Sequence, residues 1–368
     1  MITKNVLQES EKGIDFSDFW NDTLVRPAPT DADPAVVVGC NIPQLDTHKH
    51  MLVNGFGDET CINVPAHSDA PKPIQIQSVV AMDRKALVEL NYQISVGEDS
   101  RVQIIHCDDT VGNLRSLSSN TTHLVVGEGA SVEFYKLQNI NNQSGVINRM
   151  TVVMKPHSSL KMVCLSLNGG HICNHIEVRM QGEGCQLQAD GLYLLDRDQQ
   201  CDNYIFVDHA HPHCTSRELY KGILDDQARA RFNGHVLVRD GACKTEAYQS
   251  NKNIILNDKA HMDTRPFLEI YNDDVKCSHG STVGQLDEQA LFYLQTRGIS
   301  HRTATMMLSY AFCDEVIRNI GIDPLRSAIE DMVKRRLHGE LNSCADCALQ
   351  CGGPCNTERR FTIDPTQL

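Results

Sequence analysis

The sequence has little of three things: long hydrophobic runs, positive charge and aromatic side chains. Its apolar runs, such as residues 35–38, are far shorter than the ~20 residues of a membrane-spanning helix, so we expect no membrane partner. Lys and Arg number 34 against 47 Asp and Glu, and this net charge of −13 argues against nucleic acid as a partner. The N-terminus lacks the apolar segment of a secretory signal, so we expect a cytoplasmic protein.

Cysteine is abundant, with 15 in 368 residues, a length that allows two or three domains. The count is odd and most cysteines stand singly among apolar neighbours. In a reducing compartment such residues are buried thiols rather than a disulfide framework. Two places differ from this pattern. They are Cys277, which is close to His279, and a terminal group of four, Cys344, Cys347, Cys351 and Cys355.

A turn-and-strand unit recurs from about residue 73 to residue 283. Each copy has a polar turn with Gly, Asp or Asn, then a small residue, then alternating apolar and polar positions, as in 127–134, 225–232 and 272–279. The alternation predicts half-buried strands, and no helical periodicity interrupts them, which argues against βαβ units. A β-sandwich could use such strands, but irregularly spaced copies favour a stacked solenoid. The aromatic content of 5% fits its narrow interior.

The C-terminal part changes to helical periodicity. We expect helices over residues 287–298, 300–321 and 323–341, with Ser300 capping the second and Asp323 capping the third ahead of a proline. The chain then divides into an N-terminal segment with a linker, a β-core, a helical domain and a Cys-rich tail. The expected bounds are 1–45, 46–285, 286–342 and 343–368.

Several long stretches resemble the SufB/SufD family of the SUF machinery, which assembles iron–sulfur clusters. They are 214–234, 244–258, 266–285 and 286–299, so the resemblance covers about residues 200–320. It implies a mainly β fold: a right-handed parallel β-helix followed by a helical domain. It also implies a non-catalytic scaffold that pairs through its β-helix with a SufB-like subunit. A SufC-like ABC ATPase would dock on the C-terminal helices.

Within the family, the segment Val275–Thr282 matches the SufD form, whereas SufB typically carries a His-Glu-Ala-Thr-Thr version. Ala260 stands where SufB has its assembly cysteine. The resemblance therefore places the chain closest to SufD, with a transient iron–sulfur cluster shared with the partner subunit.

Cys277 and His279 are two residues apart, so in a strand both side chains lie on the same face. Imidazole and thiolate are competent iron ligands, and we expect the neighbouring Lys276 to lower the thiol pKa. The resemblance gives His279 a role in the nascent cluster site at the SufB interface. The alternative is structural: Cys277 fills the interior and His279 hydrogen-bonds in the subunit seam.

The terminal cysteines have the spacing C-x2-C-x3-C-x3-C, which is dense enough for zinc or an iron–sulfur cluster but matches neither zinc-ribbon nor ferredoxin patterns. This motif supports an alternative function, a stand-alone metal or Fe–S carrier. The other interpretation is a thiol-rich tail without metal. A second metal hypothesis rests on His209, His211, His213 and Cys214, and its alternative is a solvent-facing or turn-lining histidine row.

The predicted helical domain has more apolar positions than three short helices hide among themselves. We expect a docking stripe for the ATPase at Met307, Leu308, Ala311 and Phe312; the alternative is that these residues cap the β-helix. The chain has no Walker-type phosphate loop, so it should not hydrolyse ATP itself. Parallel β-helices also include polysaccharide-cleaving enzymes, but those are mostly secreted.

Overall fold

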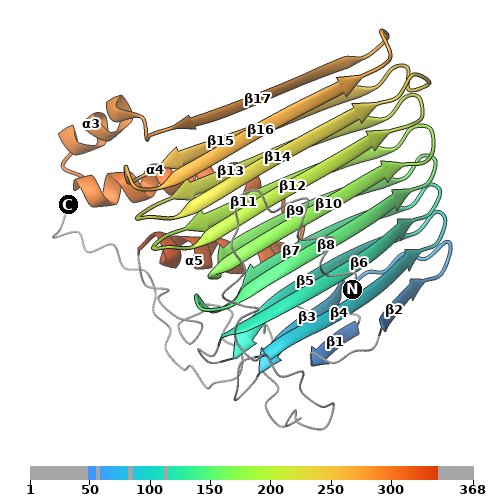
Figure 1. Ribbon diagram of the computed structural model, residues 1–368, viewed down its shortest axis with the longest axis horizontal. Coiled ribbons are helices and arrows are strands. Elements are labelled where there is room, and N and C mark those ends of the chain that lie inside the picture. Colours follow the sequence, from blue (N-terminus) through green and yellow to red (C-terminus); the bar gives the residue numbers. More distant parts are fainter. Residues whose placement is uncertain (1–48, 55–58, 82–85, 112–114, 339–368) are drawn as a thin grey trace.

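The computed structural model describes residues 49–54, 59–81, 86–111 and 115–338 (Figure 1). The described chain is a parallel β-helix followed by three helices, which confirms the predicted mainly β solenoid fold. The expected N-terminal segment 1–45 and Cys-rich tail 343–368 lie outside the described residues. No helix among those that the structure describes is long and apolar enough to cross a membrane.

Successive strands alternate between two sheets, and every strand pairing is parallel. The odd-numbered strands form a nine-stranded sheet: β1 (Lys49–Asn54), β3 (Ile74–Ala81), β5 (Arg101–Val111), β7 (Ser131–Asn139), β9 (Ser159–Asn168), β11 (Gln186–Leu195), β13 (Thr215–Leu224), β15 (Glu246–Ile255) and β17 (Lys276–Gly284). The even-numbered strands form an eight-stranded sheet: β2 (Glu59–Val64), β4 (Ala86–Val96), β6 (Ser116–Val126), β8 (Gly145–Met154), β10 (His171–Met180), β12 (Gln200–His209), β14 (Arg229–Val238) and β16 (His261–Ile270).

One coil of the solenoid contains one strand from each sheet. Ser159 pairs with Gln186, and Gln186 pairs with Thr215, so these coils are 27 and 29 residues long. Because strand side chains alternate between faces, equivalent residues of successive coils form columns that run along the interior. This stacking explains the irregular spacing of the repeats. The turns differ in length, whereas the strands stay in register, apart from one shift at Gln138/Asn139.

The turns that lead from the eight-stranded to the nine-stranded sheet share one conformation. From the β4–β5 turn to the β14–β15 turn, each contains a residue with positive φ, such as Gly129, Gly184 or His213, and the next residue is buried. Glycine adopts this conformation without steric cost, and the following position is too crowded for a large side chain. The small residues that the sequence places after its turns are therefore core residues. They include Ala130, Cys185 and Cys214.

The three helices are α3 (Glu288–Thr296), α4 (His301–Ile317) and α5 (Asp323–Leu337). Ser300 caps α4 as predicted, with its side chain accepting from the Thr303 backbone N–H. The predicted cap of α5 is wrong by one residue: Ile322 is the N-cap and Asp323 is the first helical residue, with proline still in the first turn. Pro324 has no N–H that would need a partner there, and the Ile322 side chain has no oxygen with which to cap the helix.

Helices α4 and α5 cover the outer face of the nine-stranded sheet, while α3 lies beyond them near β17 (Figure 1). The contact is a second apolar core, separate from the interior of the coils, in which Leu165 and Leu192 of the sheet meet Val316 and Ile329 of the helices. Polar contacts join the same surfaces. The Lys221 ammonium donates to the Phe312 carbonyl at 2.9 Å and pairs with the Glu315 carboxylate.

Candidate functional site

The C-terminal end of the β-helix is open among the described residues. Strands β16 and β17 are the last of their sheets, so each has a neighbour on one side only. Most side chains of β17 are exposed, in contrast to the equivalent positions of the strands below it. The open end therefore presents two free backbone edges and the inside of the last coil.

Cys277 and His279 are on the inward face of β17. The register pairs Cys277 with Ala247 and His279 with Gln249, and both of these partners point into the buried interior. With no coil above it, Cys277 is only half-buried and His279 is exposed. The open end thus offers a thiol and an imidazole on one surface.

The expected effect of Lys276 on Cys277 is wrong. Lys276 is on the opposite face of the strand, where its ammonium donates to the Glu246 carboxylate at 2.8 Å. Partial burial raises the pKa of the Cys277 thiol instead of lowering it. At neutral pH this group is a thiol that would lose its proton on binding a metal, rather than a preformed thiolate.

Two buried polar residues lie beneath His279 in the same interior column. Gln249 on β15 and Glu218 on β13 are each 3% exposed, and the Gln249 amide donates to Glu218 Oε2 at 2.8 Å. Burial raises the pKa of Glu218 to about 8, although the hydrogen bond from Gln249 acts in the other direction. Sequence reasoning missed both residues; the available signal was a glutamate at an inward, normally apolar position of an alternating strand.

The histidine row does not form a metal site. His209 ends β12 and points inward, where its Nε2 is 2.9 Å from Ser216 Oγ, and burial lowers its pKa to about 4. His211 and His213 belong to the turn that follows, and His213 is exposed. The prediction assumed one continuous strand, whereas this turn separates the three rings. No group of three or more His, Cys, Asp or Glu side chains arranged for a metal ion occurs in the part of the chain that the structure describes.

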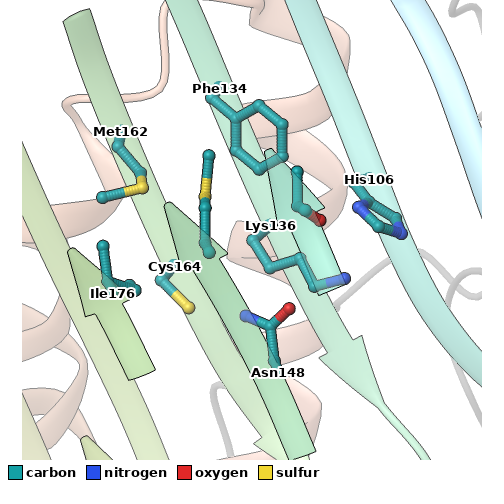
Figure 2. Close-up of a pocket in the computed structure, with 9 residues that line it drawn as sticks. His106, Phe134, Lys136, Asn148, Met162, Cys164 and Ile176 are labelled. Atoms are coloured by element: carbon teal, nitrogen blue, oxygen red, sulfur yellow. The ribbon is translucent and has the colours of Figure 1, made fainter. Parts of the chain in front are cut away.

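A pocket inside the middle coils is a second cluster with unusual chemistry. Figure 2 shows His106, Lys136 and Cys164 around it, together with apolar side chains such as Phe134 and Met162. The buried Lys136 ammonium donates to Asp108 Oδ1 at 2.8 Å. Burial and the nearby ammonium lower the pKa of His106, so its ring is neutral. These groups are enclosed in the core and partly joined by hydrogen bonds, although His106 Nδ1 and Asp108 Oδ2 have no partner among the described residues, so the cluster is a buried network rather than an accessible site.

The predicted docking stripe on α4 is partly accessible. Met307 and Ala311 are exposed and Leu308 is partly buried, whereas the Phe312 ring packs under the Lys221 ammonium at 4.3 Å. The helix α3 adds two aromatic side chains that the sequence analysis did not single out, Phe292 and Tyr293, which are 69% and 56% exposed. Buried residues of α4 include Ala304, Cys313, Val316 and Ile317, so the packed face and the free face are distinct.

The predicted metal ligands Cys344, Cys347, Cys351 and Cys355 lie outside the described residues.

Comparison of the chain with known proteins identifies a family that shares these features. A family model described as "SUF system FeS cluster assembly, SufBD core domain" matches residues 80–312. The iron–sulfur cluster assembly protein SufD of Escherichia coli is 27% identical over 299 residues, which cover 80% of this chain and 71% of that protein. A SufBD family protein of Synechocystis is 28% identical over 311 residues, covering 82% and 66%. SufD of Bacillus subtilis is 26% identical over 305 residues, covering 80% and 68%.

Proposed function

The chain belongs to the SufBD core family of the SUF system for iron–sulfur cluster assembly, and from this premise we propose that it is a SufD-like scaffold subunit. In this proposal it works in the cytoplasm and catalyses no reaction itself. It holds a nascent cluster together with a SufB-like subunit. A SufC-like ABC ATPase, docked on its helices, supplies ATP hydrolysis.

The observation that carries the proposal is the open end of the β-helix. Free strand edges pair readily with strands of another chain, and proteins that keep such an edge exposed usually cover it in a complex. The rim around β16 and β17 also exposes apolar side chains, namely Ile270 at 41% and Val283 at 42%. A SufB-like subunit that adds its own strands here would satisfy the backbone edges and bury this rim.

Pairing at this end would enclose Cys277 and His279 between the two subunits. The cluster is cargo, and its iron would be held by the His279 imidazole, with the Cys277 thiolate as a second ligand and a cysteine from the SufB-like partner completing the set. Ala260, which has no ligating atom, fits an asymmetric site in which the partner provides that cysteine. Changing His279 to Ala should leave complex formation intact and lower cluster assembly.

The free faces of α3 and α4 are the proposed ATPase contact. Phe292 and Met307 are exposed large apolar side chains on neighbouring helices, away from the core that holds α4 on the sheet. Such a patch on a helical appendage suits a protein partner. Replacing both residues by Asp should remove the ATPase from the complex while leaving the SufB-like subunit bound.

The decisive test is co-expression of the full chain with the host's SufB-like and SufC-like proteins, followed by purification and sizing. We expect one complex that contains all three proteins. Recovery of the chain without a SufB-like subunit would contradict the proposal.

A second candidate function, a stand-alone metal or Fe–S carrier, rests on Cys344, Cys347, Cys351 and Cys355. We propose zinc or an iron–sulfur cluster as their ligand. The purified chain should then contain stoichiometric metal that is lost on truncation at residue 342. Absence of metal from the full chain would eliminate this candidate.

A further inference from the structure

Gln249 lies directly beneath His279. The two are register partners on adjacent parallel strands and both are on the inward face. Neighbouring strands are about 4.8 Å apart, which puts a glutamine side chain within reach of the ring above it. His279 closes the column at the open end, so no further coil of the described chain lies above its ring.

The orientation of the Gln249 amide is fixed by its surroundings. Its Nε2 donates to the buried Glu218 carboxylate at 2.8 Å. On the opposite sheet, Gly234 provides the space for the amide, because a Cβ atom at this position would be 2.3 Å from Nε2. In this orientation Oε1 lies on the side away from Glu218 Oε2.

The Oε1 atom of Gln249 is buried and has no hydrogen-bond partner among the described residues. A buried acceptor without a partner destabilises the fold, so its retention needs a reason. A neutral imidazole has one N–H donor and one unprotonated nitrogen. Histidines that ligate metals usually donate their other ring N–H to a carbonyl or carboxylate, which fixes the tautomer.

We propose that Gln249 is a positioning residue for His279: its Oε1 accepts a hydrogen bond from one ring N–H, so that the other ring nitrogen is unprotonated and faces out of the open end. Glu218 acts one coil deeper by holding the amide in the required orientation. The inference rests on the proposed function for its purpose, because an outward unprotonated nitrogen is what an iron ligand needs. The hydrogen bond itself does not depend on that function.

The tautomer of His279 tests the hydrogen bond without any cluster. In the full chain labelled with ¹⁵N-histidine, the His279 signals are those that vanish in His279→Ala. We expect the ratio of the two tautomers to differ about five-fold from that of a free histidine, as a hydrogen bond of ordinary net strength gives. Gln249→Met, of similar size but without an acceptor, should bring the ratio close to that of a free histidine, and Gln249→Glu, which keeps an acceptor, should restore the shifted ratio.

The control is Ser250→Ala, because Ser250 is the next residue on β15 and points to the other face. It should leave the ratio unchanged. A wild-type tautomer ratio equal to that of a free histidine, or a shifted ratio that survives in Gln249→Met, would overturn the inference. If the thermal melt shows that Gln249→Met is unfolded, the decision rests on Gln249→Glu, and loss of the shifted ratio there would equally overturn it.

Cluster assembly on the complex with the SufB-like subunit separates this inference from the proposed function. Gln249→Met should lower assembly at least ten-fold and Gln249→Glu should restore most of it, the range seen when a partner of a metal-bound histidine is removed. Undiminished assembly in Gln249→Met would remove the positioning role. If instead His279→Ala assembles clusters normally while the shifted tautomer ratio is present, the proposed ligand role fails and the hydrogen bond stands.

Discussion

The middle coils and the last coil use the same inward positions for opposite purposes. One interior column of the nine-stranded sheet is apolar from β5 to β11 and polar from β13 to β17. Its members in order are Ile104, Phe134, Met162, Ala189, Glu218, Gln249 and His279. The adjacent column ends at Cys277, above the apolar Ala247. In a solenoid, an inward position belongs to the core only while another coil covers it, so chemistry can be placed at the end without a separate pocket.

The difference also shows what the polar end costs. In the middle coils, the buried Lys136 ammonium is paired with the Asp108 carboxylate at 2.8 Å. Towards the open end, Glu218 has no cationic partner among the described residues. Buried atoms without a hydrogen-bond partner occur in both regions of the described chain, for example Asp108 Oδ2 in the middle coils and Gln249 Oε1 near the end. Buried polar groups without partners destabilise a fold. Glu218 and Gln249 are set apart by their place directly beneath His279, and the following variants test whether they support this residue or the fold.

The largest expected effect comes from comparing the two ends of one column. Phe134→Ala removes a ring that is 1% exposed and should lower the free energy of unfolding by about 3–5 kcal/mol. His279→Ala, at the exposed end, should change it by less than about 0.5 kcal/mol. Urea unfolding of both variants provides the measurement. Similar losses would show that the open end is part of the core.

Glu218 should make stability depend on pH in a direction opposite to that of ordinary carboxylates. Its pKa is about 8 in the folded chain, against 4.5 in the unfolded chain. Between these values the folded state holds a proton that the unfolded state releases. This contribution is therefore complete below pH 4.5 and is lost as pH rises through 8, by about 1.4 kcal/mol per pH unit.

The measurement for Glu218 is the difference in unfolding free energy between the wild type and Glu218→Gln. Between pH 5 and pH 8, the wild type should lose about 3 kcal/mol of unfolding free energy relative to Glu218→Gln. His209, whose pKa is lowered, stabilises the fold as pH rises, but it is present in both proteins and cancels. A difference that stays constant with pH would mean that Glu218 is ionised in the folded chain.

The sequence was sufficient for the fold because its signals are local. A small residue after a polar turn, as at Ala130 or Cys185, marks the place where each coil closes, and alternation marks the strands. Because side chains alternate along a strand, the spacing of two residues also places Cys277 and His279 on one face. It does not reveal that Gln249 lies beneath His279, because that contact depends on the exact length of the intervening turn. Of the two interpretations of the histidine row, the metal site fails because the strand of His209 ends before His211, whereas His211 and His213 do line a turn.

The covered face of the nine-stranded sheet provides the next contrast with the open end. Lys221 joins β13 to α4 through the Phe312 carbonyl and the Glu315 carboxylate, and its side chain is almost fully buried. Lys221→Met should cost about 2 kcal/mol, because it leaves these acceptors without their cationic donor. Hydrogen exchange should accelerate in α4 and remain unchanged in β17. Equal acceleration at both places would show that the helices and the open end unfold as one unit.

The smallest effect on stability, and the sharpest on assembly, should come from the rim of the open end. Val283→Lys replaces an exposed valine, so the free energy of unfolding should change by less than about 0.5 kcal/mol. In the proposed complex the same position is buried against the SufB-like subunit. A lysine there would have to lose its water without gaining a partner, and pairing should weaken at least 100-fold.

The matched control is Val125→Lys, because Val125 is similarly exposed, at 36%, but lies on β6 far from the open end. It should pair like the wild type when both variants are compared by sizing and titration. Pairing that survives Val283→Lys, or that is lost equally in Val125→Lys, would place the interface elsewhere on the molecule.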